Sequence, residues 1–169
     1  MITPKYLQTL YDYHYWAVGR LLDTAAHLDP TDLDVAPLKG LGSLRQILVH
    51  TLSAEWLWSN RLRGVSPSAM LDPAEFPTLS AIRARWAEEE ATLRAVIAGL
   101  DEADLTQELA YRTTGGTAHS NPRWQILVHL ANHGTQHRSE AAALLTALGH
   151  SPGDLDMIVF FRAQASHNS

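Results

Sequence analysis

Three histidines in this sequence have a spacing that could bind a metal ion. His133 and His137 are four residues apart within one predicted helix, and His50 lies in an earlier predicted helix. Residues at i and i+4 share a helix face, so two imidazoles can reach one ion. Three imidazoles with an open position form a Lewis-acid site. Because little else in the sequence indicates chemistry, these histidines are the candidate functional site.

Spacing alone leaves the choice of histidines open. His129 and His133 are also four residues apart, and the pentapeptide that ends at His50 recurs, letter for letter, ending at His129. On a helical projection of about 100° per residue, His137 falls near the middle of an apolar stripe and His133 lies to one side of it, whereas His129 lies farther away. Of the two pairs, only 133/137 therefore borders the predicted core. Gly134 in that stripe indicates the close approach of a neighbouring helix. Periodicity permits a core-facing His50 but does not require it.

Four long helices are expected to position these side chains. Ser43 and Asn121 are the expected N-caps of the second and fourth helices. Weak alternation around a Gly-Gly pair predicts a small hairpin over residues 109–119, and a short C-terminal helix is expected to start at Ser151 and to carry Leu155. The predicted fold is therefore an all-α four-helix bundle, with long helices at about Pro4–His27, Ser43–Gly64, Thr78–Gly99 and Pro122–Gly149.

Composition narrows the class of protein. The chain has 169 residues, enough for one domain over residues 1–169, with 46% hydrophobic and 18% charged residues. It contains no cysteine, which excludes disulfides and thiolate ligands, and its net charge of −5 argues against nucleic-acid binding. The sequence shows no apolar run long enough for a membrane span and no signal-peptide core, so a cytoplasmic location is expected.

Several polar residues near the histidines admit more than one interpretation. His14 lies in the apolar stripe of the first helix and is interpreted as a hydrogen-bonded core residue rather than a metal neighbour. A hydrolase would need a general base, for which Glu55, Glu140 and His14 are the candidates. Glu55 should project from a different side of its helix than His50. Arg138 and Glu140 are interpreted as ion-pair or interface residues, and the five tryptophans as core.

At these residues the chain resembles the DinB/YfiT-like superfamily of damage-inducible helical bundles. The most specific match is residues 124–140 followed by 148–152, and residues 47–56 and 13–17 also match. The resemblance implies an up-down-down-up bundle with a divalent metal held by His50, His133 and His137. At position 14, where the family often has asparagine, this chain has histidine.

The resemblance also implies a range of functions. Superfamily relatives include thiol S-transferases that use bacillithiol and isomerases that use mycothiol, so a metal-dependent thiol S-transferase is the leading hypothesis. A metal-dependent hydrolase and a non-enzymatic stress-inducible metal-binding protein are the alternatives. Zinc is the default metal, with nickel, manganese or iron as alternatives. We expect a small-molecule substrate, a low-molecular-weight thiol as a candidate second substrate, and a homodimer. No nucleic-acid or membrane partner is expected, and no catalytic residue is assigned.

Overall fold

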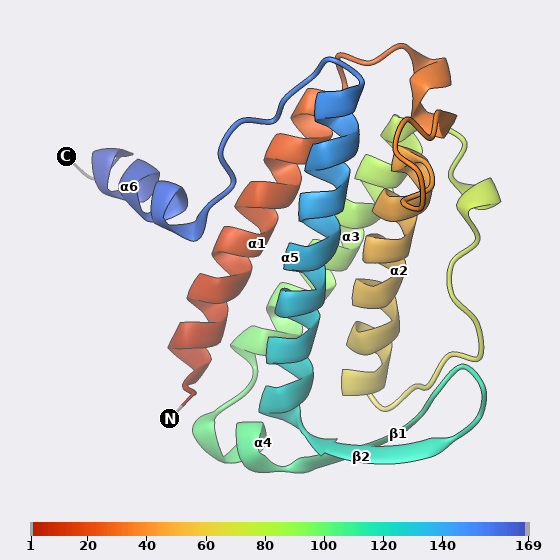
Figure 1. Cartoon of the computed structure of the whole chain (residues 1–169). Helices are drawn as coiled ribbons and strands as arrows, with labels where there is room; N and C mark the ends of the chain where they lie inside the picture. The colour runs from red at the N-terminus through yellow and green to blue at the C-terminus, as the bar shows by residue number, and fades with distance from the viewer. Residues whose placement is uncertain (1, 168–169) are drawn as a thin grey trace.

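Four long helices run side by side and form the body of the molecule (Figure 1). The computed structural model describes residues 2–167. The long helices agree with the sequence prediction to within a few residues, and shorter elements connect them. The long helices are α1 (Pro4–Ala25), α2 (Leu44–Leu62), α3 (Leu79–Ala98) and α5 (Arg123–Ala147), and the short ones are η1 (Pro30–Asp34), η2 (Pro73–Glu75), α4 (Glu102–Thr106) and α6 (Met157–His167).

The helix directions are up, down, down and up, as the family resemblance implied (Figure 1). Near the start of both helices, the Tyr11 hydroxyl of α1 donates to the Leu127 carbonyl of α5 at 3.0 Å, so α1 and α5 are parallel. An ion pair of 2.9 Å joins Arg83, early in α3, to Asp23, late in α1, so these two helices are antiparallel. One long connection, residues 63–78, returns the chain from the lower to the upper end of the bundle and produces this order, whereas residues 99–122 join α3 to α5 at the lower end (Figure 1).

Local sequence accounts for three of the four helix starts. The side chains of Thr3, Ser43 and Thr78 each accept a hydrogen bond from a backbone N–H of the first turn, and Ser43 forms a full capping box with Gln46. The predicted cap at Asn121 is wrong. Asn121 lies in a strand, and Pro122 occupies the cap position of α5 without a side-chain hydrogen bond.

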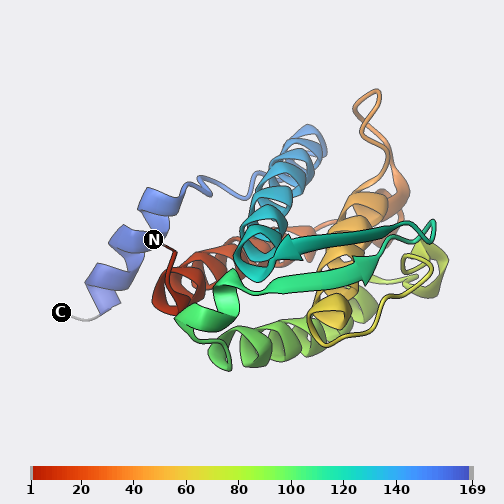
Figure 2. The same cartoon turned by 90° about the horizontal axis from the view of Figure 1, so that it is seen from below.

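A two-stranded antiparallel hairpin closes the lower end of the bundle. Strand β1 (Glu108–Arg112) pairs with β2 (Ala118–Pro122), with Tyr111 opposite His119. This confirms the predicted hairpin. Seen from below, the hairpin extends from the start of α5 across to the end of α2 (Figure 2). It therefore brings its side chains to the gap between the two helices that carry the histidines.

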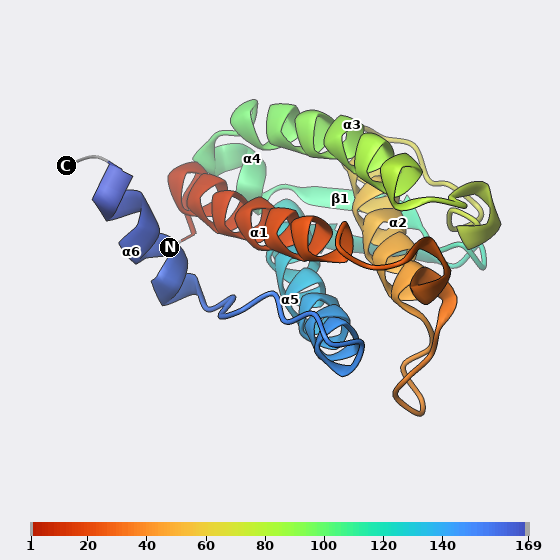
Figure 3. The ribbon, with the colours of Figure 1, turned by 90° about the horizontal axis from the view of Figure 1, so that it is seen from above.

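The C-terminal helix α6 lies outside the four-helix body. It begins at Met157, later than predicted, so Leu155 precedes it. Phe160 is buried against Tyr13 and Ala17 of α1 in a small apolar cluster, whereas the main core is formed by α1, α2, α3 and α5 together with shorter segments. The view from above shows α6 beside α1 only (Figure 3). Among the described residues, no helix is both long and apolar enough to cross a membrane.

Candidate metal centre

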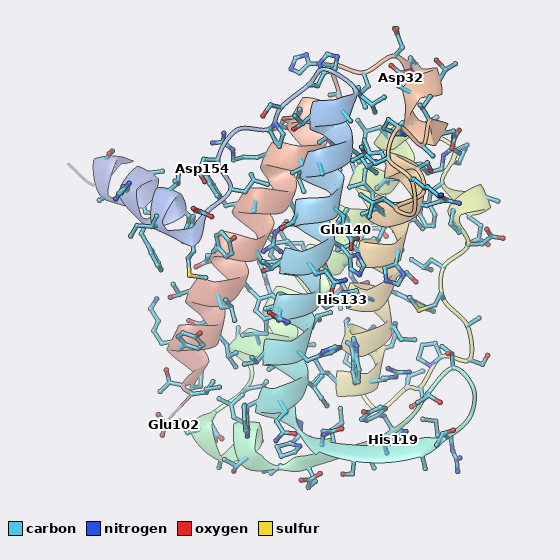
Figure 4. The ribbon with its side chains drawn as sticks, viewed as in Figure 1. Asp32, Glu102, His119, His133, Glu140 and Asp154 are labelled. Carbon is cyan, nitrogen blue, oxygen red and sulfur yellow. The ribbon has the colours of Figure 1, made fainter. Side chains whose placement is uncertain are left out.

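His50 of α2 and the pair His133/His137 of α5 come together in a group that could hold a metal ion. One ligand nitrogen from each ring lies within 4.8 Å of the others. The ring centroid of His50 is 5.2 Å from that of His133 and 4.6 Å from that of His137. In Figure 4, His133 lies about halfway along α5 on the side that faces α2. His50 is exposed and its two neighbours are partly buried, so the group is open to solvent on one side.

Antiparallel packing decides which histidines meet. His50 is seven residues into α2 and His129 is seven residues into α5, but the two helices start at opposite ends of the bundle (Figure 1). His50 therefore lies level with the residues one and two turns beyond His129, which are His133 and His137. The repeated pentapeptide thus does not produce equivalent positions, and His129 is exposed at the edge of the group.

The donor atoms fit a small divalent cation. The Nε2 atoms of His133 and His137 lie 3.1 Å apart. A tetrahedral zinc ion with bonds of about 2.0–2.1 Å requires ligand nitrogens about 3.3 Å apart. The Nδ1 atom of His133 is buried and has no hydrogen-bond partner among the described residues, so Nε2 is its only engaged nitrogen. Two imidazole nitrogens that converge in this way suit a cation.

Glu140 orients His137. Its Oε2 atom accepts a hydrogen bond of 2.6 Å from Nδ1 of His137, one turn earlier on α5. A proton held on Nδ1 leaves the lone pair of Nε2 free to bind a metal, and a carboxylate partner of this kind raises the basicity of an imidazole ligand. Glu140, interpreted from the sequence as an ion-pair or interface residue, is bonded to a histidine of the group, and with a neutral ring this contact is a hydrogen bond rather than an ion pair.

The environment favours neutral imidazoles. Burial, followed by repulsion from His137 and His50, lowers the pKa of His133 to about 4. Burial also lowers the pKa of His50, with a further contribution from His137. Because a metal binds the neutral ring, protons compete weakly for these two residues near neutral pH.

Two of the predicted general-base candidates are engaged in the bundle core. The Nε2 atom of His14 is 2.8 Å from Oε1 of Glu55, and both side chains are buried. Glu55 also accepts hydrogen bonds of 3.1 Å from the Tyr15 hydroxyl and the Trp86 indole N–H. Burial raises the pKa of Tyr15, and the charge of Glu55 adds to this shift, so the hydroxyl remains a donor. His14 is thus the core histidine that periodicity predicted.

Arg138, interpreted from the sequence as an ion-pair or interface residue, is instead part of the same buried hydrogen-bonded cluster. Its Nη1 atom donates to Nδ1 of His14, and Nη2 donates to the Thr135 hydroxyl at 2.8 Å. Because arginine can only donate, Nδ1 of His14 accepts and the ring proton lies on Nε2, facing Glu55. Burial lowers the pKa of Arg138, whereas Tyr13 and Glu55 act in the opposite direction.

Gly134 makes this cluster possible. A Cβ atom at position 134 would lie 2.4 Å from Cε1 of His14. The predicted close approach is confirmed: the neighbour is a histidine side chain of α1.

A pocket of about 360 Å³ beside the histidines was missed by sequence reasoning. Its wall includes Trp58, which was interpreted as a core residue but is only half-buried. The signal in the sequence was the i, i+3 pair of Trp58 and Arg61 on α2, which places an aromatic ring and a charge on one face. Pairing these residues with the distant hairpin required the tertiary structure.

The fold and the histidine group together define a helical-bundle protein with a three-histidine group able to hold a metal ion. A DinB family model matches residues 1–168, and the chain belongs to that family. A crystal structure of a conserved protein from Enterococcus faecalis is similar, with a TM-score of 0.65 and 14% sequence identity over 83% of this chain and 95% of that chain. At that identity the likeness shows the fold alone. Among curated proteins, none matches the chain.

Proposed function

We propose that the protein is a metal-dependent enzyme in which His50, His133 and His137 bind one divalent cation, zinc by default, and that it transfers a low-molecular-weight thiol to an electrophile. The observation that carries the proposal is the convergence of three histidine nitrogens within 4.8 Å of one another. A cation held by three neutral imidazoles keeps its double charge and, when bound, stabilises a thiolate or a polarised carbonyl.

The residues of the chain contribute binding and orientation. Glu140 holds the proton of His137 on Nδ1, so that Nε2 points into the group. His50 is exposed, which leaves a side from which a substrate can approach. Since the chain contains no cysteine, the sulfur nucleophile must arrive with a second substrate.

The hydrogen bonds of the candidate bases support thiol transfer over hydrolysis. A hydrolase needs a carboxylate or imidazole that is free to accept a proton near the reacting water. Glu55 and His14 are buried and bonded to each other, and Glu140 is bonded to His137. A thiol needs less assistance, because its pKa of about 8.5 is close to neutral pH.

Metal content by mass spectrometry, on untagged protein never exposed to a nickel column, is the first test. We expect about one metal ion per chain in the wild type and none in His50→Ala, because two imidazoles on one helix bind much more weakly than three ligands. His27→Ala, an exposed histidine outside the group, is the matched control and should keep the metal. A wild type that cannot be loaded with zinc, nickel or manganese would refute the proposal.

Activity assays then separate the three functional hypotheses. A thiol transferase consumes an electrophile only when a thiol is added, and loses this rate in His50→Ala. Turnover without thiol would instead indicate a hydrolase. Metal binding without either activity would indicate a non-enzymatic metal-binding protein.

A further inference from the structure

The pocket beside the histidine group has mainly aromatic and amide walls. It is formed by α2, α5 and the hairpin, and its lining residues are Trp58, Tyr111, Asn121, Gln125, Ile126 and His129. His129 connects it to the metal centre, because its ring centroid is 5.9 Å from that of Trp58 and 6.0 Å from that of His133. A small molecule in this pocket would therefore extend toward the three histidines.

Arg61 lies behind the aromatic wall and has no acidic partner. Its guanidinium carbon is 4.5 Å from the ring centroid of Trp58 and 5.1 Å from that of Tyr111, and the residue is only 4% exposed. Its Nε atom is buried without a hydrogen-bond partner, and no carboxylate among the described residues forms an ion pair with it.

A buried charge without a counter-ion is costly. The faces of the two rings and the carbonyl end of α2 offset part of this cost. Burial lowers the pKa of Arg61, but a guanidinium keeps its charge at any ordinary pH. The pocket thus has a fixed positive charge behind two aromatic rings.

The amides of the pocket are oriented by a short chain of hydrogen bonds. The Tyr111 hydroxyl donates to Oδ1 of Asn121 at 3.0 Å, and Nδ2 of Asn121 donates to Oε1 of Gln125 at 3.1 Å. Gln125 accepts through its oxygen, so its NH₂ group is available as a donor. Among the described residues that line the pocket there is no carboxylate. The polar groups are therefore suited to a negatively charged ligand.

We propose that this pocket is a subsite for the anionic end of a flat small molecule, an aromatic or unsaturated carboxylate, and that Arg61 selects for its charge. The rings of Trp58 and Tyr111 provide flat apolar surface, and His129 leads from the pocket to the histidine group. The subsite deepens the proposed function and rests on it for the reaction at the other end of the molecule. Binding of the carboxylate itself requires no metal.

Benzoate and its neutral isostere benzamide are suitable probes, used on the full-length, metal-free protein so that benzoate cannot bind a metal. We expect benzoate to bind about tenfold more tightly than benzamide, the effect of one charge-assisted interaction. The indole signal of Trp58 and the side-chain amide signal of Gln125 in NMR spectra should shift with benzoate, and with benzamide only at about tenfold higher concentration. Arg61→Met should remove the preference, whereas Arg63→Met, at the exposed arginine that caps the end of the same helix, should keep it.

Equal affinity of the wild type for the two probes would overturn the proposal, and so would unchanged benzoate binding in Arg61→Met. If Arg61→Met does not fold, the comparison of benzoate with benzamide in the wild type decides the proposal. Arg61→Lys, which keeps the positive charge, should then keep the preference for benzoate. Because the probes are tested without metal, a failure of the metal-dependent function leaves this result intact. Conversely, if the protein binds metal but shows no preference for benzoate, the proposed metal-dependent function stands and the subsite proposal fails.

Discussion

At the scale of single residues, the candidate site depends on which nitrogen of each imidazole carries its proton. Glu140 determines this for His137, and Arg138 determines it for His14, although the two rings lie in different surroundings. One histidine is prepared to bind a cation and the other is part of a buried hydrogen-bond cluster. Residue type alone does not distinguish them, and their partners do.

Replacement of the carboxylate that orients His137 should weaken metal binding without unfolding the protein. In Glu140→Gln we expect zinc affinity to fall by roughly 10- to 100-fold, because the amide accepts the Nδ1 proton more weakly than the carboxylate does. Competition with a chromophoric chelator measures the change. Glu88→Gln, an exposed glutamate of α3, is the control and should bind zinc normally. Equal affinities in the two variants would contradict the orienting role of Glu140.

The metal-free protein should lose stability as the pH falls from about 6.5 to about 4. The pKa of His133 is about 4 in the folded chain against 6.5 ordinarily, so the unfolded chain binds more protons in that interval. Because the ring is partly exposed and solvent screens its interactions, we expect the free energy of unfolding to fall by only roughly 1–2 kcal/mol. The decrease should be complete below about pH 4.

Urea unfolding at several pH values measures this loss, and His133→Gln should show a shallower dependence than the wild type. His27→Gln, an exposed histidine, should keep the wild-type slope. If His133→Gln also keeps that slope, another group causes the acid sensitivity.

At the scale of elements, the contact between α1 and α5 depends on a residue without a side chain. Alanine normally stabilises a helix by about 1 kcal/mol relative to glycine. At position 134 the added Cβ would lie 2.4 Å from Cε1 and 2.8 Å from Nδ1 of His14, a ring that is buried and bonded on both sides. Steric overlap should therefore outweigh the gain in helix propensity.

We expect Gly134→Ala to lower the free energy of unfolding by roughly 1–3 kcal/mol. The matched substitution is Gly19→Ala in α1, where nothing lies within 4 Å of the new Cβ, and it should raise stability by about 0.5–1 kcal/mol. Chemical denaturation of both variants measures the two effects. A stabilised Gly134→Ala would show that α1 can move away from α5 at little cost.

At the scale of the whole molecule, one buried cluster joins all four long helices. Glu55 of α2 accepts hydrogen bonds from His14 and Tyr15 of α1 and from Trp86 of α3, and Arg138 of α5 completes it through His14. Because Arg138 follows His137 directly, the cluster also fixes the position of α5 along its axis relative to α2. That axial position determines whether His50 lies close enough to His133 and His137 to share a metal ion with them.

Glu55→Gln should destabilise the fold by about 1–3 kcal/mol, because an amide nitrogen would face donors that now meet carboxylate oxygens. Thermal unfolding checks this prediction, and zinc affinity should fall in parallel if the cluster sets the helix positions. Asp23→Asn, which removes a mostly exposed ion pair with Arg83, should change stability by less than about 1 kcal/mol. Similar losses in both variants would show that the buried cluster has no special structural role.

The sequence by itself determined the long helices, the N-cap at Ser43, the hairpin and the presence of a pair of histidines at i and i+4. These depend on interactions within a few residues, such as the contact of Ser43 with the first turn of α2. The family resemblance added the helix directions and the choice of His50. The structure alone showed the roles of Arg138, Glu140 and Arg61, and the reason that His129 lies outside the group. Some of their partners lie on other helices or on the hairpin, and which side chains meet there depends on how the elements pack, which local sequence does not determine.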